Sequence, residues 1–385
     1  MDYTNCMNKF FRKHIPFFIM ISIHSIQIIF LIVFLCLEKN VAFAEFWTRT
    51  FGRYYTWGFS EFNSLFKFSI TEVSFYIVVI SCIFYLGWGF SLLRTRRPWD
   101  FIHRVLMITL IVTGSIVMYN YSVGAAYYRE KLPLELYEGE VNKDKIKDIC
   151  TYFVNDYNEC AQALGINEEG EIKMPYTKEH MIEKLRLEFD KLDDPYYNPY
   201  VASPKPIQSS GIYTSASIVG MYFGVLGEVN YNTFPTNAEL PYYIAHELCH
   251  AKGVMREGDA NLLAQYVLTT SDDPYFRYSA YWCSLDYLIK LMPAAQLNEE
   301  YKDVLSLICD EIWQNNRYVA KHWEGATYFY DLGNRINDWY LKMQGEKSGT
   351  SSYDGTPGEV DPSGNVIRLS SFQSLYFKLY YDKNP

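Results

Sequence analysis

The sequence predicts an α+β protein in which three transmembrane helices precede a mainly α-helical domain with a small β-sheet. Three observations lead to this prediction. Three long apolar runs lie near the N-terminus, the composition becomes that of a soluble domain near residue 122, and the remainder combines helical apolar spacing with one short β-rich stretch. We therefore expect a membrane region over residues 1–121 and an extracytoplasmic domain over residues 122–385.

The predicted spans cover approximately residues 15–37, 73–93 and 101–119. The first, IPFFIMISIHSIQIIFLIVFLCL, is long enough to cross a bilayer and follows a basic segment at residues 9–13. A cleaved signal peptide is the alternative, because AFA at residues 42–44 has the small residues of a cleavage site. The apolar run is longer than the core of a typical signal peptide, which favours a retained anchor.

The loops between the spans predict the orientation of the chain. RTRRPWD, between the second and third spans, carries Arg94, Arg96 and Arg97, whereas the preceding loop has mixed charges. Because short cytoplasmic loops are enriched in basic residues, we expect a cytoplasmic N-terminus and a domain outside the cell membrane. The outer loop over residues 45–68 is rich in Trp, Tyr and Phe, so we expect it to lie along the membrane surface.

Charge and cysteine content exclude some classes of protein. A formal charge of −9 and a pI near 5.4 argue against nucleic-acid binding, which requires a basic face. Aromatic residues make up 18% of the chain, which suits membrane interfaces and a large core. The eight cysteines are irregularly spaced without a CxxC pair, so a disulfide framework is not expected.

The domain beyond residue 122 is predicted to be mainly helical. Residues 143–164 and 177–192 have the apolar spacing of helices, and long helices are expected from residue 241 to about residue 345. Residues 211–233, GIYTSASIVGMYFGVLGEVNYNT, are rich in β-branched and aromatic residues and predict one or two strands. Such a strand could offer its edge to an extended peptide or lie inside a sheet. From residue 366 a final helix or strand is expected.

The segment PYYIAHELCHAKGVMREGDANLLAQY, residues 241–266, contains the candidate functional site. In a helix, His246 and His250 project from one face about 6 Å apart, which suits two ligands of one tetrahedral zinc. Glu247 lies beside that face, in the position of a general base that does not bind the metal. Gly253 is a natural helix stop, after which the chain can turn back. The alternative is a chance match on a solvated helix face, but the apolar YYIA before the motif and the glycine, acid and asparagine after it favour a metal site.

A third protein ligand is expected, because a catalytic zinc usually has three. Glu257 is the first acid after the turn and begins a new helical pattern. Asn261 falls four residues later on the same face, where it could hydrogen-bond a ligand imidazole. Asp259 is the rival ligand, but two residues after Glu257 it points away from that face.

A metallopeptidase with this HExxH motif would also need a hydrogen-bond donor for the oxyanion that develops as the peptide bond is hydrolysed. Tyr340, Tyr353 and His322 are candidates, and we choose Tyr353, in the loop-like GTSSYDG, as the residue for this role. Cys249 lies inside the histidine motif, but the chain offers no convincing Cys/His pair. We therefore interpret Cys249 as a buried helix residue rather than a nucleophile.

Residues 202–267, which end in LPYYIAHELCHAKGVMREGDANLLAQYV, and residues 271–282, SDDPYFRYSAYW, resemble the uncharacterised bacterial family DUF3810. Members of this family carry N-terminal membrane spans and a HExxHxxGxxxExxAN-type pattern. The resemblance covers most of the chain and implies a zincin-like, gluzincin-like metallopeptidase.

It also implies roles for individual residues. His246, His250 and Glu257 would be zinc ligands, and Glu247 the catalytic base. The sequence departs from the expected pattern at Gly258, where an acid or another helix former would be usual, and this puts the start of the second helix in question.

These observations predict a membrane-anchored zinc metallopeptidase that acts on a peptide or protein substrate outside the cytoplasmic membrane. The expected cofactor is Zn²⁺, the expected partners are the substrate and the lipid bilayer, and no nucleic acid is expected. The alternative is a non-enzymatic membrane protein with a structural zinc site or an extracellular partner-binding domain. A retained Glu247 favours the enzyme, because a structural site has no need of a base.

Overall fold

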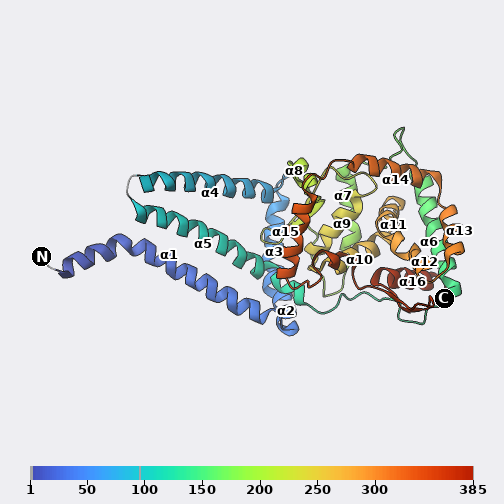
Figure 1. Cartoon of the computed structure of the whole chain (residues 1–385), viewed down its shortest axis with the longest axis horizontal. Helices are drawn as coiled ribbons and strands as arrows, with labels where there is room; N and C mark the ends of the chain where they lie inside the picture. The colour runs from blue at the N-terminus through green and yellow to red at the C-terminus, as the bar shows by residue number, and fades with distance from the viewer. Residues whose placement is uncertain (1–2, 95–96, 385) are drawn as a thin grey trace.

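The computed structural model describes residues 3–94 and 97–384, with side chains from residue 15 onward. Three long helices extend from one side of a mostly helical domain (Figure 1). Few residues form strands, which agrees with the predicted α+β class in its broad form.

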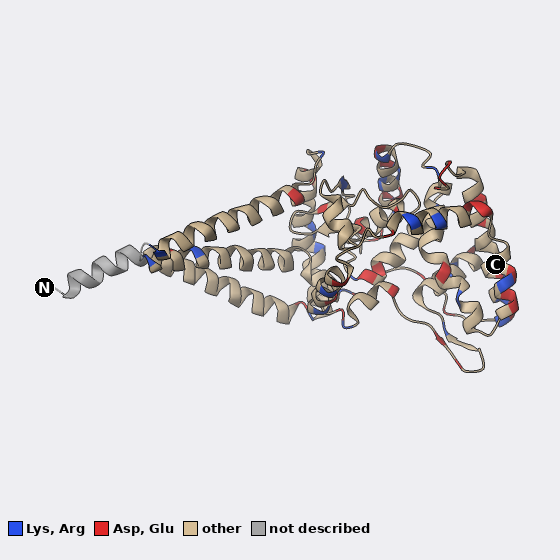
Figure 2. Ribbon diagram, turned by 45° about the horizontal axis from the view of Figure 1, so that its top comes forward, with Lys and Arg blue, Asp and Glu red and all other residues tan. Residues whose placement is uncertain are grey.

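Three N-terminal helices are long and apolar enough to cross a membrane. They are α1 (Tyr3–Leu37, with the apolar part Ile15–Leu37), α4 (Ile70–Arg94) and α5 (Pro98–Ser122). Few of their side chains are buried within the protein, and few charges lie along them (Figure 2). The three predicted spans are therefore confirmed as long apolar helices. Of the basic residues used to predict orientation, Arg96 and the side chains of residues 9–13 lie outside the described part of the chain.

The loop between the first two spans is helical and lies where the spans meet the domain (Figure 1). It contains α2 (Val41–Trp47), the π-helical turn η1 (Thr48–Gly52) and α3 (Arg53–Ser64). The Arg53 guanidinium donates to the carbonyl oxygens of Pro195 at 2.8 Å and Tyr197 at 3.1 Å. This loop therefore packs on the domain as well as linking two spans.

Two buried ion pairs fasten the spans to the domain. Arg129, which follows α5, donates to the Glu45 carboxylate on α2 at 3.0 Å. Lys205 contacts Glu228 at 2.7 Å, and Glu228 also accepts hydrogen bonds from the backbone N–H groups of the first two residues of α4. At the N-terminus of α4, the Glu228 carboxylate pairs with N–H groups that have no partner within the helix, and its negative charge complements the helix dipole.

Most of the domain is helical. Its helices are η2 (Gly124–Tyr128), α6 (Lys143–Leu164), α7 (Lys178–Asp190), α8 (Ser210–Ser215), α9 (Leu240–Ala251), α10 (Glu257–Thr269), α11 (Pro274–Ile289), α12 (Leu291–Ala294), α13 (Asn298–Ser306), α14 (Asp310–Trp323), α15 (Tyr330–Met343), η3 (Gly349–Asp354) and α16 (Ser371–Lys383). One apolar cluster surrounds α7, α9 and α10, and a second joins α6, α11 and α16.

Three short strands form a sheet in the order β1–β3–β2. The central strand β3 (Glu228–Tyr231) pairs in parallel with β1 (Lys205–Pro206) and antiparallel with β2 (Gly220–Phe223). Among the described residues β2 is therefore an edge strand, and it packs against α9. A second sheet pairs β4 (Glu359–Val360) with β5 (Val366–Arg368), so the segment from residue 366 forms a strand followed by α16.

The β-rich stretch at residues 211–233 contains two strands, but its first residues are helical rather than extended. They belong to α8, whose start is held from outside the segment. The backbone N–H groups of Gln208 and Ser209 donate to the carboxylate of Glu72 on α4, each at 2.8 Å. This tertiary contact satisfies donors before a helix start and outweighs the β propensity of the local sequence.

Candidate metal site

The histidine motif lies on α9, a helix enclosed by the domain. Eleven of its twelve residues are buried, and His246, Glu247 and His250 are only 8%, 6% and 6% exposed. A chance match would place these polar side chains on a solvated face, where water satisfies them. Here the protein itself must satisfy them, because a buried unpaired polar group costs free energy.

A left-handed turn ends α9 and orients one histidine. Gly253 has φ +90°, a conformation that glycine adopts without steric cost, and its N–H donates to the His250 carbonyl at 2.9 Å. The turn brings the carbonyl of Val254 back to His250, whose Nδ1 contacts that oxygen at 2.8 Å. The predicted helix stop is therefore present, and the same turn fixes the ring of His250.

Three side chains converge on one point beyond this turn. The Nε2 atoms of His246 and His250 are 3.1 Å apart. Oε2 of Glu257 lies 3.1 Å from His246 Nε2 and 3.4 Å from His250 Nε2. Among the described side chains, those of residues 15–94 and 97–384, these three form the group of His, Cys, Asp or Glu with the spacing of a metal site.

The hydrogen bonds of the two Nδ1 atoms determine where each imidazole carries its proton. They indicate that the convergent Nε2 atoms suit a cation. His246 Nδ1 contacts the side-chain oxygen of Asn261 at 2.7 Å, and the Asn261 amide nitrogen donates to the Tyr353 carbonyl at 3.0 Å, which fixes the orientation of the amide. His250 Nδ1 faces a carbonyl oxygen. Both Nδ1 atoms must therefore donate, so the Nε2 lone pairs of the neutral imidazoles point at each other and at a carboxylate. Only a proton or a metal ion between them relieves the repulsion.

The pKa values of Glu257 and His250 also indicate that a positive charge stabilises this group of side chains. Burial disfavours the charged form of Glu257, but His250 and His246 outweigh it and lower the pKa of this carboxyl to about 2. Burial likewise opposes the charged form of His250, but Glu257 outweighs it and raises the pKa of His250 to about 9. The three donors suit Zn²⁺, which binds imidazole nitrogen and carboxylate oxygen.

Glu257 and Asp259 have different surroundings, as expected from their places on the helix. Glu257 is the first residue of α10 and is buried at the site, whereas Asp259 pairs with Arg256 at 2.6 Å. Asn261, one turn after Glu257, contacts His246. The structure thus places Glu257 and Asn261 together with the histidines and leaves Asp259 outside.

Gly258 follows the candidate ligand and allows a close approach of two backbones. A Cβ atom at this position would lie 2.6 Å from the carbonyl oxygen of Ser352 and 2.7 Å from Cα of Gly355. Both residues belong to η3 or follow it directly, so only glycine lets η3 lie against the start of α10. The departure from the expected pattern at Gly258 therefore has a packing reason, and α10 still begins at Glu257.

Glu247 lies beside the histidines and against β2. A Cβ atom on Gly220 would lie 2.6 Å from Oε1 of Glu247, so the carboxylate occupies the space that a side chain on β2 would need. Burial raises the pKa of Glu247, and this outweighs the opposing effects of His246, His250 and a hydrogen bond from the Tyr222 backbone. A carboxyl group with a raised pKa is suited to accept and return a proton near neutral pH.

Of the three oxyanion candidates, Tyr353 contacts the histidine motif. Its ring stacks on His246, with centroids 6.0 Å apart and planes inclined by 29°, and its hydroxyl accepts from Asn337 at 3.3 Å. Burial, followed by the charge of Glu257, raises the pKa of Tyr353, so its hydroxyl stays protonated and can donate. His322 instead contacts the Phe234 carbonyl at 2.8 Å.

Tyr340 belongs to a cluster of tyrosine hydroxyls near the site. Its hydroxyl contacts that of Tyr119 on α5 and lies 3.1 Å from that of Tyr127 on η2. Burial raises the pKa of Tyr340 to about 12, and the carboxylate of Glu257 contributes to the rise. The contacts of Tyr119 and Tyr127 with Tyr340 could not be predicted from the sequence, because no local pattern relates a membrane-length helix to a helix more than two hundred residues later.

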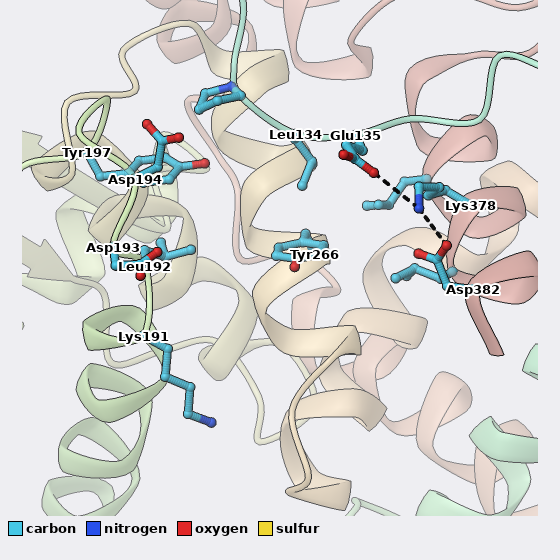
Figure 3. A pocket seen from close by; sticks show the side chains of 13 residues that line it. Leu134, Glu135, Lys191, Leu192, Asp193, Asp194, Tyr197, Tyr266, Lys378 and Asp382 are labelled. Carbon is cyan, nitrogen blue, oxygen red and sulfur yellow. Dashed lines mark hydrogen bonds and ion pairs between the residues drawn. The ribbon is translucent and has the colours of Figure 1, made fainter.

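Cys249 and a separate pocket do not belong to the convergent group. Cys249 is buried, and its burial raises the pKa of the thiol, which makes a nucleophilic role unfavourable. A separate polar pocket of about 290 Å³ lies among the segment after η2, the residues after α7, α10 and α16 (Figure 3). Its lining includes Glu135, Asp194, Tyr266, Lys378 and Asp382, and none of the three convergent residues.

Comparison with known proteins places the chain in a family without assigning an activity. No curated protein and no solved structure matches it significantly. The family described as "Protein of unknown function (DUF3810)" matches residues 47–358, which include the whole histidine motif, η3 and two of the three apolar helices. The chain therefore belongs to the DUF3810 family.

Proposed function

We propose that the protein is a membrane-anchored zinc metallopeptidase that hydrolyses peptide bonds outside the cytoplasmic membrane. The observation that carries the proposal is the convergence of His246, His250 and Glu257, with the buried Glu247 beside them. These three residues would hold the metal through two imidazole nitrogens and one carboxylate oxygen. The zincin-like character is an inference from this arrangement and the HExxH spacing.

Different residues of the chain have different roles in the proposed hydrolysis. When bound, zinc supplies a Lewis acid that polarises the substrate carbonyl and makes a coordinated water more acidic. The Glu247 carboxylate accepts the proton of the attacking water and returns it to the nitrogen of the departing amine. Asn261 holds the tautomer and orientation of His246. The protonated hydroxyl of Tyr353 is the candidate donor to the developing oxyanion.

The edge strand β2 offers a binding mode for the substrate. Its outer side is unpaired among the described residues, and its first residue touches Glu247. An extended peptide that adds to this edge would gain main-chain hydrogen bonds and lie next to the proposed base. Of the two alternatives left open by the sequence, an edge strand fits this substrate class.

The alternative remains a non-enzymatic membrane protein with a structural zinc or a partner-binding domain. A structural zinc site is usually closed by four protein ligands, whereas the convergent group here has three. A buried carboxyl group that does not join this group also costs free energy, which a structural site would have no reason to retain. Both features favour the enzyme.

Metal analysis and a cleavage assay on the purified full-length protein test the proposal. We expect one zinc per chain, lost in His246→Ala and His250→Ala. Glu247→Gln should keep the zinc and lose about 100- to 10,000-fold in cleavage of a broad peptide library, because it removes only the base. Unchanged zinc in the histidine variants would contradict the metal site. Zinc-loaded protein without cleavage of any peptide would favour the non-enzymatic alternative.

The proposed location has its own test. Arg94 ends α4 and Arg97 directly precedes α5. Both therefore lie where the two helices join, at the end of the pair that is distant from the domain (Figure 1). If that end is cytoplasmic, protease added to intact protoplasts should digest the domain while a cytoplasmic control protein survives. Full protection of the domain would reverse the orientation.

A further inference from the structure

Helix α15 exposes an apolar face that no part of the described chain covers. Leu332, Ile336, Trp339 and Met343 follow one another at helical spacing and are 57%, 58%, 65% and 59% exposed. Burial of such side chains would stabilise a protein, so a continuous exposed row marks a contact surface. Tyr328, Phe329 and Tyr330 extend the row at the N-terminal end of the helix.

The opposite face of α15 is fastened to the domain. Gly333 packs so closely on the carbonyl of Ala216 that a Cβ atom there would overlap it, and Phe329 donates its N–H to Ser215 at 2.7 Å. Leu341 is fully buried. The helix is therefore held with its apolar row outward, and the row is not the core face of a detached helix.

The contact with α5 sets the level of α15 relative to a bilayer. Tyr340 contacts Tyr119, which lies in the last turn of α5. A helix of 25 residues is about 37 Å long, so its ends lie at the headgroup layers of a bilayer whose apolar core is about 30 Å thick. Tyr340 must then lie near the same layer, and so must its neighbour Trp339.

The surrounding elements lie at the same level. In Figure 1, α15 and α3 both lie at the end of the domain from which α4 and α5 extend. Helix α3 and the residues after it also expose large apolar side chains, among them Tyr54, Phe62 and Leu65. The ion pairs of Glu45 and Glu228 hold this face on the spans. The apolar row of α15 thus lies at the same end of the domain as other apolar surface that lipid would cover.

We propose that α15 lies in the headgroup layer of the bilayer, with Leu332, Ile336, Trp339 and Met343 against the lipid acyl chains. Trp and Tyr prefer this layer, because their rings are apolar and their polar atoms remain hydrated. The exposed charges of α15 include both signs, with Asp338 paired to Lys342 at 2.7 Å. The contact is therefore hydrophobic and requires no anionic lipid.

This position connects the lipid surface to the candidate metal site. Asn337, on the inner side of α15, donates to the hydroxyl of Tyr353, and the ring of Tyr353 stacks on His246. Lipid contact on one face of α15 thus stabilises the element that positions Tyr353 on the other. The membrane contact does not depend on peptidase activity; it rests on α4 and α5 spanning a bilayer.

Tryptophan fluorescence of the full-length protein in phosphatidylcholine vesicles tests the contact. The difference between wild type and Trp339→Phe isolates the emission of Trp339 among the eight tryptophans. We expect most of this emission to be lost in vesicles whose lipids are brominated on their acyl chains, and to resist acrylamide in the aqueous phase. Trp313, 40% exposed on α14, is the matched control, because α14 is not among the elements at the membrane face. Its emission should resist brominated lipid and be quenched by acrylamide.

Two results would overturn the proposal. Emission of Trp339 that resists brominated lipid and is quenched by acrylamide would show that the row faces water. Emission that resists both quenchers would show that another protein surface, such as a second copy of this chain, covers it. Neither result depends on cleavage or zinc content, so failure here is distinguishable from failure of the proposed function.

Discussion

Zinc binding should release a proton from His250, because this side chain holds the positive charge of the metal-free site. Its pKa is raised from 6.5 to about 9, since Glu257 lies 3.4 Å away and outweighs the effect of burial. Zinc requires the neutral imidazole. At pH 7 the protonated form therefore exceeds the neutral form about 100-fold, and apparent zinc affinity should rise about tenfold per pH unit until it levels near pH 9.

Chelator competition at constant ionic strength measures this slope once the chelator's own protonation is subtracted. A pH indicator in weak buffer then counts the released protons, with about one per zinc expected at pH 7 to 8. Because Glu247 also has a raised pKa, the count should be repeated in Glu247→Gln, which removes its contribution. The proton assigned to His250 should remain.

Two variants identify the source of the proton. Glu257→Gln removes the charge that raises the pKa of His250, and burial then lowers that pKa, so affinity should be weaker and nearly independent of pH above pH 7. Asp259→Asn is the matched control, because Asp259 pairs with Arg256 outside the site. A wild-type affinity that is flat from pH 6 to 9, or a slope that persists in Glu257→Gln, would refute the reasoning.

Further predictions concern the third ligand and the contact between η3 and α10. Glu257→Ala should weaken zinc binding far more than Asp259→Ala, and chelator competition at one pH would reverse the assignment if Asp259→Ala were the more damaging. Asn261→Ala should reduce zinc affinity or activity about 10- to 100-fold, as expected for a residue that orients a ligand; an unchanged value would deny it that role. Gly258→Ala should lower the free energy of unfolding by about 1–3 kcal/mol, because the added methyl group displaces η3. Gly211→Ala, with open space around its Cβ position, is the control, and equal stability of the two variants would contradict the packing argument.

The parts of the protein that depend on local patterns could be predicted from the sequence. Long apolar runs suffice for three membrane-length helices, because the bilayer fixes their length and composition. The spacing of His246 and His250, the helix stop at Gly253 and the helical face shared by Glu257 and Asn261 all lie within one short segment. Helix geometry and the turn at Gly253 therefore predict which of these side chains meet.

The parts that depend on distant contacts could not be predicted. The β-rich stretch begins in α8, because the carboxylate of Glu72, on a membrane-length helix, accepts hydrogen bonds from the backbone N–H groups of Gln208 and Ser209 just before that helix. Nothing near Tyr340 in the sequence indicates that it meets Tyr119. Gly258 departs from the expected pattern, and its reason appears only when η3 packs against it. In each case one partner lies more than ninety residues from the other, beyond the reach of any periodicity.

The turn at Gly253 lets the three convergent residues come from one short segment of the chain. The residues that converge, from His246 to Glu257, close a loop of about a dozen residues, and the entropy lost in closing a loop grows only with the logarithm of its length. Tyr353 instead arrives from about ninety residues further along the chain and is held by α10 and α15. The residues proposed to hold the metal and the residue proposed to bind the oxyanion thus come from different parts of the chain. In the proposed enzyme, substitutions that loosen η3 should therefore lower turnover more than they lower zinc content.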